Sequence, residues 1–201
     1  MTVGYMTEPG IWQGRLIRLR AVEPDDWQRF FDWDADTEFA RYDYSIWFPG
    51  SREQSRKWTA DLAMSGAKNH EYRWVIETLE GEFAGTLNTH TCDARAGTFR
   101  YGVAVRREHW RKGYASEAIR LVLAFFFREL RYQKVNVEIY EFNAASLALH
   151  RKLGFREEGR LRRTVYTGGR YYDEFVLGMT IEEFEGPFAP APDGMSQAPE
   201  V

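Results

Sequence analysis

The chain has 201 residues, 44% of them hydrophobic and 28% charged, with a formal net charge of −3 at pH 7. This composition is typical of one globular domain and argues against a general nucleic-acid binder. No apolar run approaches the roughly 20 residues that cross a bilayer, Cys92 is the only cysteine, and no signal peptide is recognisable, so a cytoplasmic protein without a disulfide framework is expected.

The first half of the chain reads as one strand, two helices and three further strands. A loose tail over residues 1–10 is followed by a strand over 16–22 and a helix over 24–33 that starts at a proline. Ser51 and Gln54 form a capping box, which predicts a second helix ending near residue 66. Strand-like runs then cover 72–78, 82–91 and 98–105.

A basic loop follows the third of these runs. Four cations lie in it: Arg106, Arg107, Arg111 and Lys112. Gly113 then opens a helix whose apolar residues recur at helical spacing up to residue 130. The first N–H groups of a helix have no partner inside it, the dipole is positive there, and small residues let an anion reach the backbone. The loop therefore predicts a phosphate site, with a solvated basic surface as the competing interpretation.

The second half alternates strand and helix patterns. Residues 134–141 read as a half-buried strand, and Asn143 then caps a helix that ends at Gly154. Asn143, Ser146 and His150 are spaced to share one face of this helix. Runs over 155–166 and 170–179 form a hairpin around a Gly-Gly turn. From residue 186 onward proline, alanine, glycine and serine dominate, and disorder is expected.

Two of these segments together resemble the motifs of the GNAT superfamily of acyl-CoA-dependent N-acyltransferases, over about residues 12–184. The phosphate loop of that superfamily reads roughly (Gln/Arg)-x-x-Gly-x-(Gly/Ala), and the segment 110–115 fits it from Gly113 onward. A later motif, roughly Asn-x-x-Ser-x-x-x-(Tyr)-x-x-x-Gly-Phe, is matched by Asn143, Ser146, Gly154 and Phe155. Trp110 and the run 113–118 look most like the RimJ/RimL-type ribosomal-protein N-terminal acetyltransferase branch.

The resemblance implies an α/β (α+β) fold in a single GNAT domain over residues 11–185. Its sheet would be mixed, mostly antiparallel and twisted, with about six or seven strands, about four flanking helices and a splayed strand pair holding the cofactor. The cofactor would be acetyl-CoA or coenzyme A. The residues expected to bind it are Val103, Val105, Arg111, Lys112, Gly113, Tyr114, Ala115, Ser116, Asn143, Ser146 and His150.

The implied reaction is transfer of an acetyl group from acetyl-CoA to a primary amine by direct attack in a ternary complex. The backbone around Val103 to Val105 would supply the N–H donor for the thioester oxygen, and Ser146 and His150 complete the expected catalytic set. His150 stands where many relatives place the tyrosine that protonates the thiolate. A neutral histidine would donate a hydrogen bond rather than surrender a proton. The competing interpretation is a partly exposed histidine without a role.

The general base is open at the sequence level. Four groups lie at plausible strand ends: Glu71, His90, Asp93 and Asp173. The carboxylate that the family often places on the strand before the phosphate loop is absent, because this chain carries Arg100 and Tyr101 there. A water relay is the alternative.

Acceptor recognition is expected in the aromatic and acidic segments 41–49 and 171–173, unless these aromatics fill the core. The acceptor would be a protein N-terminus, a polyamine or another small amine. No metal, nucleic acid or membrane is expected to take part, and the chain would be a monomer or homodimer. The alternative function is a non-catalytic acyl-CoA-binding module on the same fold.

Overall fold

The computed structural model describes residues 10–43 and 46–188. Residues 1–9, 44–45 and 189–201 lie outside the described part, and they include most of both tails expected from the sequence. No helix of the described residues is long and apolar enough to cross a membrane.

Seven strands form one sheet in the order β1-β2-β3-β4-β5-β7-β6. Their bounds are Ile17–Ala21 for β1, Arg73–Thr78 for β2, Phe83–Asp93 for β3, Thr98–Val105 for β4, Lys134–Tyr140 for β5, Arg156–Thr167 for β6 and Arg170–Thr180 for β7. Every neighbouring pair is antiparallel except β4 and β5, which are parallel. The sheet is therefore mixed and mostly antiparallel, as the sequence predicts.

Six α-helices accompany the sheet within the described residues. Their bounds are Trp27–Asp34 for α1, Thr37–Asp43 for α2, Arg52–Ser65 for α3, Tyr114–Ala124 for α4, Ala144–Leu153 for α5 and Ile181–Phe188 for α6. The sequence predicts about four helices, and α2 and α6 are the two it misses. Asp36 accepts a hydrogen bond from the Phe39 N–H (2.9 Å) and so caps α2, a signal that the sequence carries.

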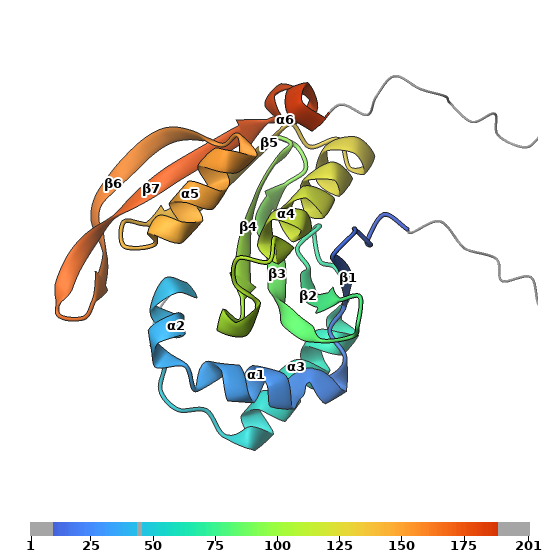
Figure 1. The fold of residues 1–201 in the computed structure, drawn as a ribbon, viewed down its shortest axis with the longest axis vertical. Coiled ribbons are helices and arrows are strands. Elements are labelled where there is room, and N and C mark those ends of the chain that lie inside the picture. Colours follow the sequence, from blue (N-terminus) through green and yellow to red (C-terminus); the bar gives the residue numbers. More distant parts are fainter. Residues whose placement is uncertain (1–9, 44–45, 189–201) are drawn as a thin grey trace, which may run out of the picture.

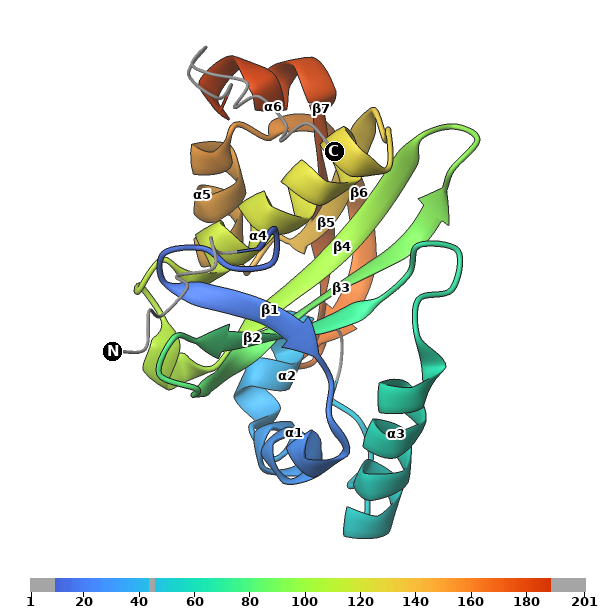
Figure 2. The ribbon, with the colours of Figure 1, turned by 90° about the vertical axis from the view of Figure 1, so that its right-hand side faces the viewer.

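The two faces of the sheet are covered by different helices. α4 packs on β1, β3 and β4, and the alternate β2 residues Trp74 and Ile76 join the larger hydrophobic core. Val75, which points the other way, joins a smaller core with Phe30 of α1 and Phe83. Figure 2 shows α1 and α3 on the side of the sheet away from α4.

The parallel strands β4 and β5 stay together for only part of their length. They pair at Thr98–Lys134, Phe99–Val135 and Arg100–Asn136, and no further. Beyond Arg100 the two strands diverge, so that α5 and the β6–β7 hairpin stand apart from the far end of β4 (Figure 1). This point of divergence, called the fork below, confirms the expected splayed strand pair.

Candidate functional site

The backbone of β4 beyond the fork offers polar groups on its open side. The Arg106 N–H donates to the Ala84 carbonyl of β3 at 2.9 Å. Because successive residues of a strand direct their backbone N–H and C=O groups to opposite sides, those of Val103 and Val105 point away from β3. The Val105 carbonyl already accepts a hydrogen bond from the indole N–H of Trp110 at 2.6 Å. The N–H groups of Val103 and Val105 therefore face the open side, where the sequence expects the thioester oxygen.

The loop between β4 and α4 is shaped for an anion. It turns through a short 3-10 turn over Arg107–His109, and Arg111 and Gly113 then adopt left-handed backbone angles, with φ of 62° and 87°. Gly113 is the N-cap of α4 and makes no side-chain cap, so the first N–H groups of α4, at Tyr114, Ala115 and Ser116, are not bonded by a capping side chain. The positive φ of Arg111 is a backbone conformation that glycine adopts without strain.

The four cations of this loop are not equivalent. Arg106 pairs with Glu108 (3.0 Å), whereas Arg107 is held by Asp36 (2.7 Å) and Glu38 (3.1 Å) near the start of α2. Arg111 and Lys112 make no hydrogen bond or ion pair within the described part of the chain. They are the two cations left to contact a phosphate.

The predicted face of α5 is formed as expected. Asn143 caps the helix by accepting the Ser146 N–H at 3.1 Å, and Ser146 lies next to His150. His150 itself is only 2% exposed, so the interpretation as a partly exposed surface histidine is wrong. The buried residues of α5 are Leu147, His150 and Leu153. His150 therefore lies on the face of α5 that packs against the core.

Hydrogen bonding fixes which nitrogen of His150 carries the proton. Nδ1 lies 2.8 Å from the Ser146 carbonyl, which only accepts, so Nδ1 must donate. Burial lowers the pKa of His150 to about 4, so the ring is neutral at pH 7 and Nε2 keeps only a lone pair. Nε2 is buried without a partner. His150 therefore presents an acceptor at the site and not the donor expected from the sequence.

Tyr101, which the sequence analysis names only in place of a strand carboxylate, lies beside His150. Its side chain is 5% exposed, its hydroxyl has no partner, and its ring stacks on His150 with centroids 5.9 Å apart. A tyrosine among the inward apolar residues Phe99, Val103 and Val105 of a strand is the signal that was available, because a buried phenol normally finds a hydrogen-bond partner.

The candidate bases are spread along the sheet. Asp93 accepts the N–H groups of Arg95 and Ala96 in the β3–β4 turn, at the far end of β4 from Val105. Asp173 is held by Arg160 at 2.6 Å, and its pKa is lowered by hydrogen bonds from the Arg163 N–H and Arg160. Such a carboxylate is a poor base.

His90 is the candidate that lies beside the fork. It is paired in register with Arg100, and burial lowers its pKa, so its neutral form is available as a base. Glu71, the fourth candidate, lies in the turn before β2, where its backbone bonds to Lys68.

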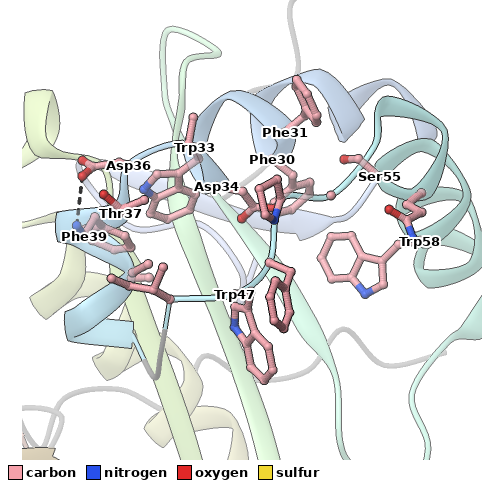
Figure 3. Close-up of a pocket in the computed structure, with 18 of the residues that line it drawn as sticks. Phe30, Phe31, Trp33, Asp34, Asp36, Thr37, Phe39, Trp47, Ser55 and Trp58 are labelled. Carbon is pink, nitrogen blue, oxygen red and sulfur yellow. Dashed lines mark hydrogen bonds between the residues drawn. The ribbon is translucent and has the colours of Figure 1, made fainter. Parts of the chain in front are cut away.

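An aromatic cavity of about 730 Å³ opens on the α1 and α3 side of the sheet. Figure 3 shows its wall, in which side chains of α1, the 46–51 segment and α3 point toward one another. Seven of its lining residues are aromatic: Phe30, Phe31, Trp33, Phe39, Trp47, Phe48 and Trp58. Ala104 of β4 also lines it. The cavity therefore reaches β4 from the face opposite Val103 and Val105.

The two segments expected to recognise the acceptor separate in the structure. Ile46 to Pro49 line the cavity, whereas Tyr44 and Ser45 of the same segment lie outside the described residues. Tyr171–Asp173 does not line it. Tyr172 instead packs edge-on against Phe142 (4.8 Å), which also contacts Tyr42 of α2. These aromatics therefore tie the hairpin to α2.

The residues present fit coenzyme A. The left-handed Gly113 and the uncapped start of α4 form a cradle for a pyrophosphate, and Arg111 and Lys112 are available cations. Two buried polar atoms without partners, Tyr101 Oη of β4 and His150 Nε2 of α5, belong to rings that stack on each other. The described residues contain no group of His, Cys, Asp and Glu that could hold a metal ion.

Comparisons with known proteins identify the family and the fold. The Acetyltransferase (GNAT) domain family matches residues 16–156. The SPbeta prophage-derived uncharacterized N-acetyltransferase YokL of Bacillus subtilis is 42% identical over 174 residues, covering 87% of this chain and 95% of that protein. A spermidine N-acetyltransferase from Vibrio cholerae, solved with CoA and spermine, has a similar fold with a TM-score of 0.73. It is 21% identical, and the match covers 84% of this chain and 97% of that one.

Proposed function

We propose an acceptor class and site residues for this chain. The chain belongs to the Acetyltransferase (GNAT) domain family and is an N-acetyltransferase, which transfers an acetyl group from acetyl-CoA to an amine. The acceptor is a primary amine with one positive charge and an apolar or aromatic body. It binds in the aromatic cavity and approaches the thioester across β4.

The composition of the cavity wall carries this proposal. Seven aromatic residues line it, against two carboxylates, Asp34 and Asp36. Asp36 is already paired with Arg107, and Arg73 brings a positive charge to the wall. A polyamine with three or four charges would need more acidic partners, whereas aromatic faces suit an apolar body and a single ammonium group.

Coenzyme A is held by the residues expected from the sequence. The pyrophosphate lies on the backbone of residues 111–116, with Arg111 and Lys112 beside it, and the N–H groups of Val103 and Val105 face the thioester. Asn143, Ser146 and His150 border the thiol end. The arrangement of β4, the loop and α5 around the fork supports this path.

Within the family, Trp110 and the run 113–118 favour the RimJ/RimL-type branch, which acts on protein N-termini. A peptide whose first side chains are apolar presents, like an arylalkylamine, a single amine beside an apolar body. The polyamine alternative takes its support from the spermidine enzyme of similar fold.

An acceptor panel tests the proposal. Release of free thiol from acetyl-CoA is measured with phenethylamine, with peptides starting in apolar or in acidic residues, and with spermidine, and products are identified by mass spectrometry. We expect kcat/KM to be highest for the amines with apolar bodies. A preference for spermidine would overturn the acceptor class, and binding without thiol release from any amine would indicate a non-catalytic module.

Two exposed aromatics allow a matched test of the cavity. Trp47 and Phe48 are 72% and 97% exposed, so Trp47→Ala and Phe48→Ala should fold normally. Each should raise KM for the acceptor by about 5- to 30-fold, as expected for losing about 1–2 kcal/mol of contact, with KM for acetyl-CoA unchanged. Tyr166→Ala, an exposed aromatic of β6 that does not line the cavity, is the control.

A further inference from the structure

Three buried side-chain polar atoms have no hydrogen-bond partner in the described part of the chain. They are Tyr101 Oη, His109 Nδ1 and His150 Nε2. An unpaired buried polar atom destabilises a fold by about 1–3 kcal/mol, so each requires an explanation. His109 lies in the phosphate loop, and the other two lie together beyond the fork.

Tyr101 and His150 form one small aromatic compartment. Their rings stack with an interplanar angle of 27°. The Phe155 ring packs edge-on against both, with its centroid 6.3 Å from that of Tyr101 and 5.1 Å from that of His150. Tyr101 is the residue of β4 directly after Arg100, the last position that pairs with β5. Tyr101, and His150 stacked on it, therefore lie near the point where the two strands begin to part.

The two groups have opposite hydrogen-bonding character. His150 Nε2 is an acceptor, because Nδ1 donates to the Ser146 carbonyl. Burial raises the pKa of Tyr101 well above its ordinary value, so the phenol keeps its proton across the neutral range. Tyr101 Oη is therefore the buried proton donor of this compartment.

We propose that Tyr101 Oη donates the hydrogen bond that stabilises the thiolate of coenzyme A as it leaves. The inference rests on the cofactor path proposed above. The ammonium group of the acceptor first loses one proton to solvent. The neutral nitrogen then forms a bond to the acetyl carbon, and the carbon–sulfur bond breaks with its electron pair left on sulfur. The sulfur accepts the hydrogen bond, the nitrogen loses a second proton to solvent, and Tyr101 keeps its own. His150 acts as a positioning residue that holds the phenol ring by stacking.

A second buried tyrosine shows what a purely structural phenol looks like in this protein. Tyr132 is 1% exposed, and its hydroxyl lies 2.8 Å from Nδ1 of His70, so its hydrogen bond is made within the fold. The Tyr101 hydroxyl lacks such a bond. This difference allows the same substitution at the two positions to have opposite effects.

The test compares Tyr101→Phe with Tyr132→Phe. Tyr101→Phe keeps every ring contact and removes only the unpaired hydroxyl, so it should raise the melting temperature while lowering kcat by about 10- to 100-fold. KM for acetyl-CoA should stay within about twofold, because the thiolate exists only along the reaction path. Tyr132→Phe should lower the melting temperature and leave kcat unchanged.

Two results would overturn the proposal. A kcat within about twofold of the wild type for Tyr101→Phe would remove the hydroxyl from the reaction. A loss of kcat together with a lower melting temperature would assign the hydroxyl to a structural hydrogen bond. Calorimetric binding of coenzyme A separates this failure from failure of the cofactor path, because a wrong path would leave Gly113→Val with normal affinity, whatever Tyr101→Phe does.

Discussion

A Cβ atom on Gly14 would lie 2.3 Å from the carboxyl carbon of Glu117, so a larger residue where the chain passes the first turn of α4 would displace the Glu117 carboxylate. The Glu117 carboxylate accepts the N–H groups of Arg15, Leu16 and Ile17 at 2.8–2.9 Å. The start of β1 is thereby joined to the helix that opens the phosphate loop.

Glu117→Gln should destabilise the fold by about 1–3 kcal/mol, because an amide group brings N–H donors toward three backbone donors. The free energy of unfolding, measured by denaturant titration, checks this. Glu80→Gln in the exposed β2–β3 turn is the control and should change it by less than about 0.5 kcal/mol. Equal stability of the two variants would show that the Glu117 bonds contribute nothing.

Gly113→Val should abolish tight binding of coenzyme A. Gly113 has a φ of 87°, and a Cβ there would meet Leu16 at 3.2 Å, so a branched side chain both strains the turn and moves the amides of α4. Affinity measured by calorimetry should fall by at least about tenfold, or roughly 1.4 kcal/mol.

Gly81→Val provides the control for backbone strain. Gly81 has a similar φ of 89° and open space around it, in the turn between β2 and β3. It should lose stability without losing affinity for coenzyme A. If Gly113→Val binds as tightly as Gly81→Val, the phosphate loop is wrongly assigned.

Local chemistry explains which parts of the fold the sequence predicts. The Ser51–Gln54 capping box and the Asn143 cap form as expected. The Gly168–Gly169 turn also forms, with φ of 58° and 83° in a two-residue hairpin. Each of these features depends on residues within a few positions of one another.

The features that the sequence does not predict depend on distant contacts. Tyr101 and His150 are far apart in sequence and meet only because α5 packs against β4 at the fork. Their burial, the tautomer of His150 and the unpaired phenol follow from that contact. The aromatic cavity likewise combines α1, α2, α3 and the sheet. A local sequence pattern does not show which of these aromatic side chains will face a cavity and which will be covered by packing.

Arg111 and Lys112 should contribute to binding acetyl-CoA, and Arg106 should not. Arg111→Gly is the sharper variant, because glycine accepts the φ of 62° while the charge is removed. Arg111→Gly and Lys112→Ala should each raise KM for acetyl-CoA by about 2- to 10-fold at low salt, and the effect should shrink at high salt. Arg106→Ala, whose side chain pairs with Glu108, is the matched control. Identical KM values for all three variants at low salt would make the loop a solvated surface.

His150 should make the stability of the protein depend on pH between about 6.5 and 4. Burial lowers the pKa of the folded group to about 4, whereas the unfolded chain takes up the proton near 6.5. Below pH 6.5 the unfolded state binds more protons, so the free energy of unfolding falls as the pH drops to about 4, by roughly 3 kcal/mol in total. His150→Phe keeps an aromatic ring and cannot titrate, so its stability should fall less over this range.

Denaturant titrations of the wild type and His150→Phe at pH 7, 5.5 and 4.5 measure this difference. The carboxylates of Asp26 and Glu77, whose pKa values are lowered by Arg20, are present in both proteins and cancel in the comparison. The curves should converge toward low pH, because the wild type alone loses the contribution of a buried neutral histidine. Parallel curves of unfolding free energy against pH would mean that His150 is charged or solvated in the folded protein. Nε2 would then no longer be a buried acceptor, and the assignment of Tyr101 as the donor would lose this support.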